Sequence, residues 1–419
     1  MIRDIAHITI EADTPLKVGS NASDFLQDSP IQRDWNGLPM ILGTSIAGVL
    51  RKDFKGDVKD IFGEESGSKV IFSNALLLDE HKRVCEELLL EKSNFLKLFD
   101  NLPIREHTAI TDKGVADEHS KFDEEVVYKG SRFKFSIEML EDREAFDKIL
   151  KLLQSSSFRL GGGRTKGFGK FQVLEISRQS YTKDSYETYS SSLNYSLGGE
   201  ASASPKGGAK APHPINHINY TLKIRPDDFF MFGSGFGDSD ADSTPVYERV
   251  IDYDKKDLTK EMILIPASSI KGALAHRTNY HYNLQNGLFI GDENARTTIS
   301  ELFGEAKNSK KDINGSRGKI LISDYFQKDK KEIKTFDHVA IDRFTGGGID
   351  GALFQEKTIA QKDEWKIEIL LEKGVDEPYI EAFESALKDI CNGMLPLGGM
   401  TTKGHGVFTG EVLKDGEKI

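Results

Sequence analysis

The chain carries the same series of motifs twice, and this duplication limits its fold more than any other feature. Each half opens with an alternating strand pattern, IAHITIEAD at 5–13 and INYTLKIRP at 218–226. A helix signal, a Phe-Gly-Glu turn, a long hairpin pattern and a glycine-rich loop follow in the same order. Matched positions lie 224, 241 and 237 residues apart, at Thr44 and Ser268, Phe62 and Phe303, and Thr165 and Thr402. The insertions differ but the order is kept, so the sequence indicates two copies of one module.

The predicted module is an α+β unit. Its elements run strand, helix, strand, long hairpin, strand, helix, glycine loop and strand, which suits a ferredoxin-like plan with an enlarged hairpin. We expect a Ser or Thr to cap the first helix of each copy, within 38–54 and 263–281. Residues 179–216 are rich in Ser, Tyr, Gly and Ala and predict a flexible linker between a first domain at 1–178 and a second at 217–419.

Charge and apolar patterning restrict the class of protein. A formal net charge of −11 argues against a free-standing nucleic-acid binder, because such proteins usually carry a basic excess. Any site for a polyanion must therefore be local. An apolar signal segment and a membrane-length apolar run are both lacking, so we expect a soluble cytoplasmic protein without a membrane partner. Cys85 and Cys391 have no metal-ligand spacing and predict two buried thiols.

The glycine-rich loops RLGGGRTKGFGK (159–170) and LGGMTTKGHGVF (397–408) are candidate anion sites. Glycines can direct several backbone N–H groups at one ligand, and phosphate is the natural guest of such a concavity. The alternative is a structural turn in which glycine supplies only dihedral freedom. A nucleotide-binding P-loop is excluded, because both loops run on into a strand and lack the required spacing. The candidate contacts are Arg159, Gly162, Gly163, Arg164, Lys166, Thr402, Lys403 and His405.

Three motifs carry a resemblance to a known family: SSIKGALAHR at 268–277, HVAIDRFTGGGIDGALF at 338–354 and LGGGRTKGFGKF at 160–171. With them the chain resembles the RAMP superfamily, and more specifically the backbone subunits of type III CRISPR effector complexes. Because the likeness occurs twice, the chain is similar to a fused double-backbone subunit of type III-D-like systems. The resemblance implies two RRM-like domains, each with a thumb-like β-hairpin, in a prokaryotic complex.

The resemblance also implies partners and contacts. The partners would be crRNA, target RNA, a large polymerase-like subunit, other RAMP subunits and a small subunit. The glycine loops and the helix starts would lie along the guide RNA, and the second hairpin would wedge between bases. The corresponding residues outside the loops are Ser45, Arg51, Ser268, Ser269, Lys271, Arg277, Arg343 and Phe344. The first hairpin is more acidic, which favours a weaker grip on RNA or a contact with a neighbouring subunit.

In this family an aspartate after the first strand cuts the opposing target RNA with a divalent metal. Asp28 in QDSPIQRD holds that place in the first half. Asp242 aligns most nearly in the second half, where an extra residue precedes Pro245 and Asp238 and Asp240 lie close by. Magnesium often takes only one or two protein carboxylates, so the expected cofactor is Mg²⁺ or another divalent ion held by Asp28 and Asp242. The expected activity is metal-dependent cleavage of target RNA at one or both sites.

Two other functions stay open at this point. The chain could be a structural backbone subunit without catalytic activity. It could also be a stand-alone, metal-independent endoribonuclease that processes precursor crRNA, with His107 or His338 as general base. Each histidine occupies the same place in its hairpin arm, where a packed or hydrogen-bonding role is the alternative.

Overall fold

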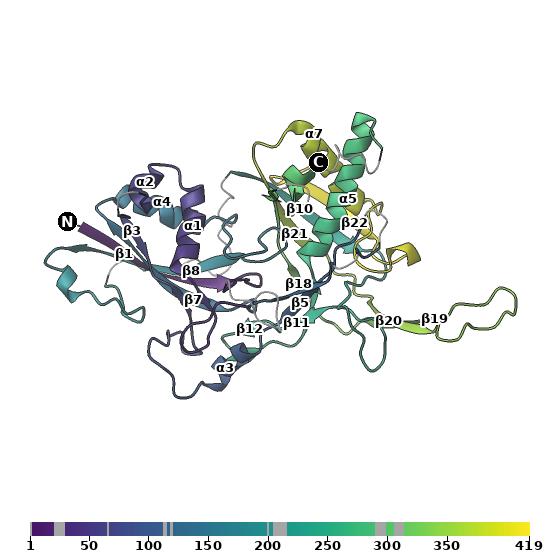
Figure 1. Ribbon diagram of the computed structural model, residues 1–419, viewed down its shortest axis with the longest axis horizontal. Helices are drawn as coiled ribbons and strands as arrows, with labels where there is room; N and C mark the ends of the chain where they lie inside the picture. Colours follow the sequence, from purple (N-terminus) through teal and green to yellow (C-terminus); the bar gives the residue numbers. More distant parts are fainter. Residues whose placement is uncertain are drawn as a thin grey trace.

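The computed structural model describes residues 2–20, 30–64, 67–111, 115–117, 120–198, 201–203, 216–289, 299–305 and 314–419. They form two α+β units side by side, each an antiparallel sheet covered by helices (Figure 1). The predicted α+β class is confirmed. None of the helices in these ranges combines the length and apolar character needed to cross a membrane.

The first unit is built around β1 (Ile2–Ala12), which pairs with β7 (Arg132–Leu140) and β8 (Phe171–Thr182). The sheet order is β2-β4-β7-β1-β8-β9, and β3 also pairs with β7. Helix α1 (Gly43–Asp53) comes after β1, and helix α4 (Arg143–Leu153) comes directly after β7. The two helices pack together. The smaller elements are β2 (Met40–Ile41), α2 (Val58–Phe62), β3 (Val70–Phe72), β4 (Ala75–Leu77), α3 (Asn94–Lys97), η1 (Leu98–Asp100), η2 (Tyr186–Thr188) and β9 (Ala201–Ala203).

The second unit repeats this plan. Its sheet has the order β17-β21-β10-β22-β23, with β10 (His217–Pro226) between β21 (Trp365–Glu372) and β22 (Phe408–Lys414). Helices α5 (Ala267–Asn286) and α7 (Glu377–Cys391) pack on each other. The others are β11 (Tyr247–Glu248), β12 (Ile251–Asp252), β13 (Asp257–Leu258), β14 (Met262–Ile265), β15 (Gly304–Glu305), β16 (Ser316–Arg317), β17 (Ile320–Ile322), β18 (Tyr325–Lys328), η3 (Thr401–Lys403) and β23 (Glu417–Lys418). In the first unit β1 lies between β7 and β8, and in the second unit β10 lies between β21 and β22. This is the arrangement of a β-α-β-β-α-β unit, in which the first strand is central.

Each unit buries its own apolar core. In the first, the alternating strand β7 turns Phe133 and Phe135 inward under α1 and α4. In the second, Trp365 is fully buried and packs against Phe230 and Phe408, with ring centroids 5.0 and 4.6 Å away. Both cysteines are free thiols, as expected, although Cys85 is only half-buried.

Each unit also carries a two-stranded hairpin. The first consists of β5 (Ile104–His107) and β6 (Phe122–Glu125), and the second of β19 (Ile333–His338) and β20 (Phe354–Ile359). The β19–β20 hairpin extends away from the body of the second unit (Figure 1). The β5–β6 hairpin instead runs beside the second unit, where His276 of α5 lies 3.3 Å from the carbonyl oxygen of Ile110.

The structure corrects the predicted start of the linker. Strand β8 continues to Thr182, and the segment after it folds back onto the first unit. Tyr181 and Leu197 are buried against Ile5, with further tyrosine rings around them. Asn194 exchanges two hydrogen bonds with the main chain of Val84, of 2.9 and 2.8 Å. Residues 179–198 are therefore part of the first domain, because their tyrosines supply the apolar surface that their aliphatic content lacks.

The expected helix caps are also corrected. The N-cap residues are Leu42 for α1 and Pro266 for α5, and neither makes a capping hydrogen bond through its side chain. The first N–H of each helix is instead accepted by a distant side chain. Gly43 donates to Asn74 Oδ1 at 2.9 Å and Ala267 donates to Asp324 Oδ1 at 2.8 Å.

The two units make an extensive contact. In the second unit, Tyr253 belongs to the apolar core of the first unit and donates its hydroxyl to the carbonyl oxygen of Leu78 at 2.8 Å. Arg105 of β5 lies between two second-unit carboxylates, at 2.7 Å from Glu248 Oε2 and 2.7 Å from Asp324 Oδ2. All three of these side chains are buried, so the contact excludes water around an ion pair.

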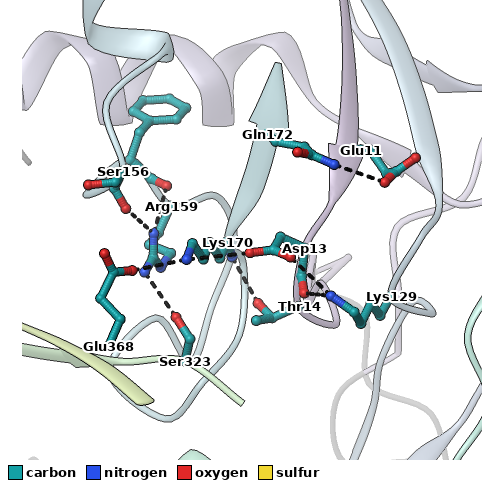
Figure 2. Close-up of polar contacts among 11 residues, drawn as sticks. Glu11, Asp13, Thr14, Lys129, Ser156, Arg159, Lys170, Gln172, Ser323 and Glu368 are labelled. Atoms are coloured by element: carbon teal, nitrogen blue, oxygen red, sulfur yellow. Dashed lines mark hydrogen bonds and ion pairs between the residues drawn. The ribbon is translucent and has the colours of Figure 1, made fainter. Parts of the chain in front are cut away.

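Figure 2 shows the adjoining part of this contact. Arg159 donates to Ser323 Oγ at 3.1 Å, and Lys170 lies 2.9 Å from Glu368 Oε2. The end of the first glycine-rich loop is thus fastened to the second unit. Sequence patterns did not indicate this packing, because each pair joins residues far apart in the chain.

Candidate nucleic-acid interface

The first glycine-rich loop is held by its own domain through main-chain hydrogen bonds. Gly162 donates to the carbonyl oxygen of Lys17 at 2.7 Å, and Gly169 donates to that of Pro15 at 2.9 Å. The carbonyl oxygen of Gly163 accepts from Lys166 at 2.7 Å. The loop is therefore folded onto the segment that follows β1.

The second loop repeats these bonds one for one. Gly399 donates to the carbonyl oxygen of Met231 at 2.7 Å, and Gly406 donates to that of Phe229 at 2.8 Å. Gly406 has φ of 74°, and a Cβ there would lie 2.1 Å from the carbonyl oxygen of Leu397. The structural-turn alternative thus describes these glycines, including Gly162, since their N–H groups are used within the fold. The N–H groups of these four glycines are therefore not available to an anion, whereas the N–H of Gly163 and the loop side chains remain candidates.

A cationic side chain of each loop lies over an aromatic ring of the neighbouring hairpin. In the first domain Lys166 Nζ lies 4.6 Å from the ring centroid of Phe122, and His107 stacks on the same ring at 5.1 Å. His107 Nε2 is 3.3 Å from the buried carboxylate of Glu124, which also bonds Lys17 at 2.5 Å. Burial alone would raise the pKa of Glu124, but His107, Lys17 and Lys166 outweigh it and hold the pKa at about 2.

The second domain has the same stack. Lys403 Nζ lies 4.4 Å from the ring centroid of Phe354, and His338 stacks on that ring at 4.6 Å. His338 Nε2 is 3.2 Å from Glu356, which is fully buried and also lies 3.5 Å from His405. His405 is itself only 7% exposed, so Lys403 carries the outward-facing charge of this loop. The paired glutamates favour a packed role for both hairpin histidines.

The first loop also meets the start of α5 in the second domain. Lys271 Nζ donates to Thr165 Oγ1 at 3.1 Å, at the turn that carries Lys166. Burial and the charge of Lys166 lower the pKa of Lys271 to about 8. Ser268 and Ser269 lie in the first turn of the same helix, whose positive end favours anions. Two lysines and a helix N-terminus thus converge where the two domains touch.

Two predicted RNA contacts on helices and loops are used inside the protein. Arg159 is only 2% exposed and donates to the carbonyl oxygen of Ser156 as well as to Ser323. Arg277 Nε lies 2.5 Å from Asp389 of α7. We therefore assign these two side chains to packing within and between the domains. Ser45 is half-buried in the first turn of α1 and Arg51 is exposed in its last turn, so both remain candidates.

The tip of the second hairpin presents apolar side chains to solvent. Phe344 is 99% exposed, and its neighbour Arg343 is exposed too. The carboxylate of Asp342 accepts the N–H of Phe344 at 3.0 Å and that of Thr345 at 2.7 Å, which orders the turn. An aromatic ring with no packing role of its own suits stacking on a base.

The candidate catalytic loops have equal lengths in the two domains. Main-chain bonds close them at equivalent places, from Ser20 to Pro30 at 3.1 Å and from Ser234 to Thr244 at 2.9 Å. Both pairs of equivalent residues differ by 214 in number, as do Asp28 and Asp242. Counted from these two bonds, Asp28 and Asp242 have the same place in the number of residues, although one residue more separates Asp242 from Pro245 than Asp28 from Pro30. Asp28 itself lies outside the described residues.

Asp242 is exposed beside the start of β20. Its Oδ2 accepts the N–H of Gln355 at 2.8 Å, while its own N–H donates to the carbonyl oxygen of Gln355 at 2.9 Å. Asp238 and Asp240 instead lie 2.5 and 3.0 Å from Lys357. Within the described ranges there is no group of three or more His, Cys, Asp or Glu side chains able to hold a metal. An exposed carboxylate with one committed oxygen still fits Mg²⁺, which commonly takes few protein ligands.

A family model identifies the chain. The model of the RAMP superfamily matches residues 9–172 and 230–409, which covers most of both domains. The chain belongs to the RAMP superfamily. The two matched segments agree with the two units of the structure, and each contains one glycine-rich loop and one hairpin of this RAMP protein.

Comparisons with individual proteins are more distant. A search of the curated proteins found no match to this RAMP chain. One matching solved structure is the cryo-EM structure of the type III-B Cmr-beta bound to cognate target RNA, at 18% identity and a TM-score of 0.32. The match covers 42% of this RAMP chain and 60% of that chain.

Proposed function

We propose that this RAMP protein is a two-domain RNA-binding subunit of a type III CRISPR effector complex. It holds crRNA beside its two glycine-rich loops and pairs it with target RNA. The partners are crRNA, target RNA, a large polymerase-like subunit, other RAMP subunits and a small subunit. Membership of the superfamily and the RNA-bound state of the type III-B neighbour support this assignment.

The observation that carries the proposal is the duplicated lysine on an aromatic ring. Lys166 and Lys403 are placed alike on Phe122 and Phe354, although 237 residues separate the two lysines. Each lies where a hairpin joins a glycine loop. A cation beside an aromatic ring offers one partner for a phosphate and one for a base, which is the combination that single-stranded RNA requires.

The proposed RNA path follows from the positions of these groups. Lys166 and Lys271 contact one backbone segment at the domain contact, where the hydroxyl of Thr165 accepts from Lys271 and keeps its own O–H for the RNA. Lys403 and Thr402 contact a second segment. The exposed ring of Phe344 at the hairpin tip separates or stacks on bases beyond it.

The proposed activity is metal-dependent cleavage of target RNA at Asp28 and Asp242. A bound divalent ion would supply charge stabilisation at the scissile phosphate. The chain itself contributes a carboxylate to hold that ion, and Asp242 is oriented for this by the N–H of Gln355. RNA cleavage through its own 2′-OH otherwise needs mainly an in-line backbone, which the hairpin and the loops would fix.

Isosteric substitutions test the activity. In the assembled complex, Asp28→Asn and Asp242→Asn keep an oxygen acceptor but remove the charge that holds a metal. We expect each variant to lose one cleavage product of a labelled target RNA while guide binding is unchanged. An unaltered product pattern in the double variant would leave a structural subunit as the function. Cleavage of precursor crRNA by the purified chain in EDTA would instead indicate the metal-independent processing enzyme.

A further inference from the structure

A basic cleft opens between the two domains, apart from the hairpins and their lysines. Its cavity has a volume of about 210 Å³ and lies between the end of α1, the segment after α4 and the approach to β17. Two acidic residues line it, Asp53 and Glu372. The cations that line it are Lys52, Lys55, Arg159, Arg164, Arg317 and Lys319. In a chain of net charge −11, this excess of cations is a local feature that requires an explanation.

The guanidinium groups of the cleft are poorly neutralised. Arg317 lies 3.1 Å from Glu372. Among the residues that the structure describes, no carboxylate lies within ion-pair distance of Arg159 or Arg164. Burial lowers the pKa of Arg159 to about 10. The pKa of Arg164 is also lowered, by burial and then by the nearby charge of Arg317.

An anion in the cleft would remove this energetic cost. A charge that is shielded from water is destabilising unless it is paired, and the half-buried guanidinium of Arg164 has no carboxylate within ion-pair distance in the described part of the chain. The planar guanidinium groups of Arg164 and Arg317 can each donate two parallel hydrogen bonds to a tetrahedral oxyanion. Lys52 is exposed in the last turn of α1, lines the cleft and adds a further positive charge. This donor set suits a phosphate group better than a single carboxylate.

We propose that the cleft between the two domains binds a phosphate group through Arg164, Arg317 and Lys52, either as a phosphodiester of an RNA strand or on a free phosphorylated compound. The site takes Arg164 and Lys52 from the first domain and Arg317 from the second. It therefore exists only while the domains are docked. Lys166 and Lys403 lie over hairpin rings and do not line the cleft, so the cleft adds contacts beyond those of the two lysines, although Arg164 belongs to the same glycine-rich loop as Lys166.

The test compares two probes on one pair of variants. A fluorescein-labelled uridine decamer is titrated at several salt concentrations by anisotropy, and inorganic pyrophosphate by calorimetry. The test variant is Lys52→Gln with Arg317→Gln, and the control is Lys183→Gln, an exposed turn residue away from the cleft. If the cleft takes RNA, the slope of log affinity against log salt falls by about 0.7, since the three cations hold one phosphate group and one lost phosphate contact on a single strand removes roughly that much.

If the cleft takes a free phosphate compound, the decamer slope is unchanged and the double variant loses pyrophosphate binding. Either loss supports the proposal and identifies the source of the phosphate. The proposal is overturned if the double variant binds both probes as the control does, or if the unmodified chain binds neither. Arg164→Gln should show the same loss of phosphate binding as the double variant. Its unfolding midpoint is measured as well, so that a loss of binding can be told from a loss of folding.

Discussion

The buried ion pair between the domains gives the sharpest prediction for stability. Arg105 is 7% exposed and lies between Glu248 and Asp324, at 2.7 Å from each. Arg105→Met keeps an unbranched apolar stem but leaves both carboxylates buried without a counter-ion. Removing one partner of a buried pair costs about 3–5 kcal/mol, so we expect a loss of that size in the free energy of unfolding.

A triple variant separates the buried charge from the shape of the side chains. Arg105→Met, Glu248→Gln and Asp324→Asn together remove every charge of the cluster. With Asp324→Asn the side-chain amide oxygen can still accept a hydrogen bond from the N–H of Ala267. The amide oxygen of Asn74 accepts the equivalent bond from Gly43 at the start of α1. The triple variant leaves no unpaired buried charge, only amides that lose the Arg105 donor at a cost of about 1–3 kcal/mol for each unsatisfied group, so it should be more stable than the single variant.

Urea unfolding followed by tryptophan fluorescence measures both effects. Trp365 is fully buried in the second core and Trp35 is half-exposed in the first domain, so the emission reports on both. The single variant should lower the unfolding midpoint, and the triple variant should raise it again. A single variant that loses less than about 1 kcal/mol, or a triple variant that is no more stable than the single one, would refute the reasoning.

Two further predictions concern RNA binding, and one concerns the stability of the second glycine-rich loop. RNA affinity should fall by up to about tenfold between pH 7 and pH 9, because Lys271 has a pKa of about 8 and loses its charge in that range. Lys271→Arg should abolish this decrease, as measured by an anisotropy titration. Gly406→Ala should lower the unfolding midpoint far more than Gly404→Ala, because both have positive φ but only Gly406 has a carbonyl oxygen in the space of the new methyl group. Phe344→Ala should weaken RNA binding by about 1–3 kcal/mol without changing stability, since the ring is 99% exposed; an unchanged affinity would remove the hairpin tip from the RNA surface.

The sequence was informative where the signal is local and periodic. The alternating patterns of β1 and β10 and the two glycine loops were recognisable because a strand has a period of two and a strained turn selects glycine. The folded segment after Thr182 was misread, because a composition rule counts few aliphatics there and does not recognise that tyrosine rings can pack. Composition alone thus gave the wrong boundary.

The contact between the domains could not have been predicted in this way. Arg105 is separated from its partners by 143 and 219 residues, and no local pattern links them. The same limit applies to Lys271, which was recognised as a helix-start residue but whose neighbour in the first glycine loop depends on how the domains dock. Equal loop lengths around Asp28 and Asp242 became clear only when the main-chain bonds at each loop base were known.

The duplication of the fold does not extend to the surroundings of the two loops. Gly43 and Ala267 begin the equivalent helices, and their offset of 224 places Ala47 where the second domain has Lys271. Lys271 of the second domain donates a hydrogen bond to Thr165 in the first glycine loop. The second loop has Lys403 over the ring of Phe354, which belongs to the same domain. Because a lysine of lowered pKa is present beside only the first of the two loops in the described residues, the loss of RNA affinity above pH 8 should arise from the first loop. Lys166→Gln should then reduce this pH dependence and Lys403→Gln should leave it intact.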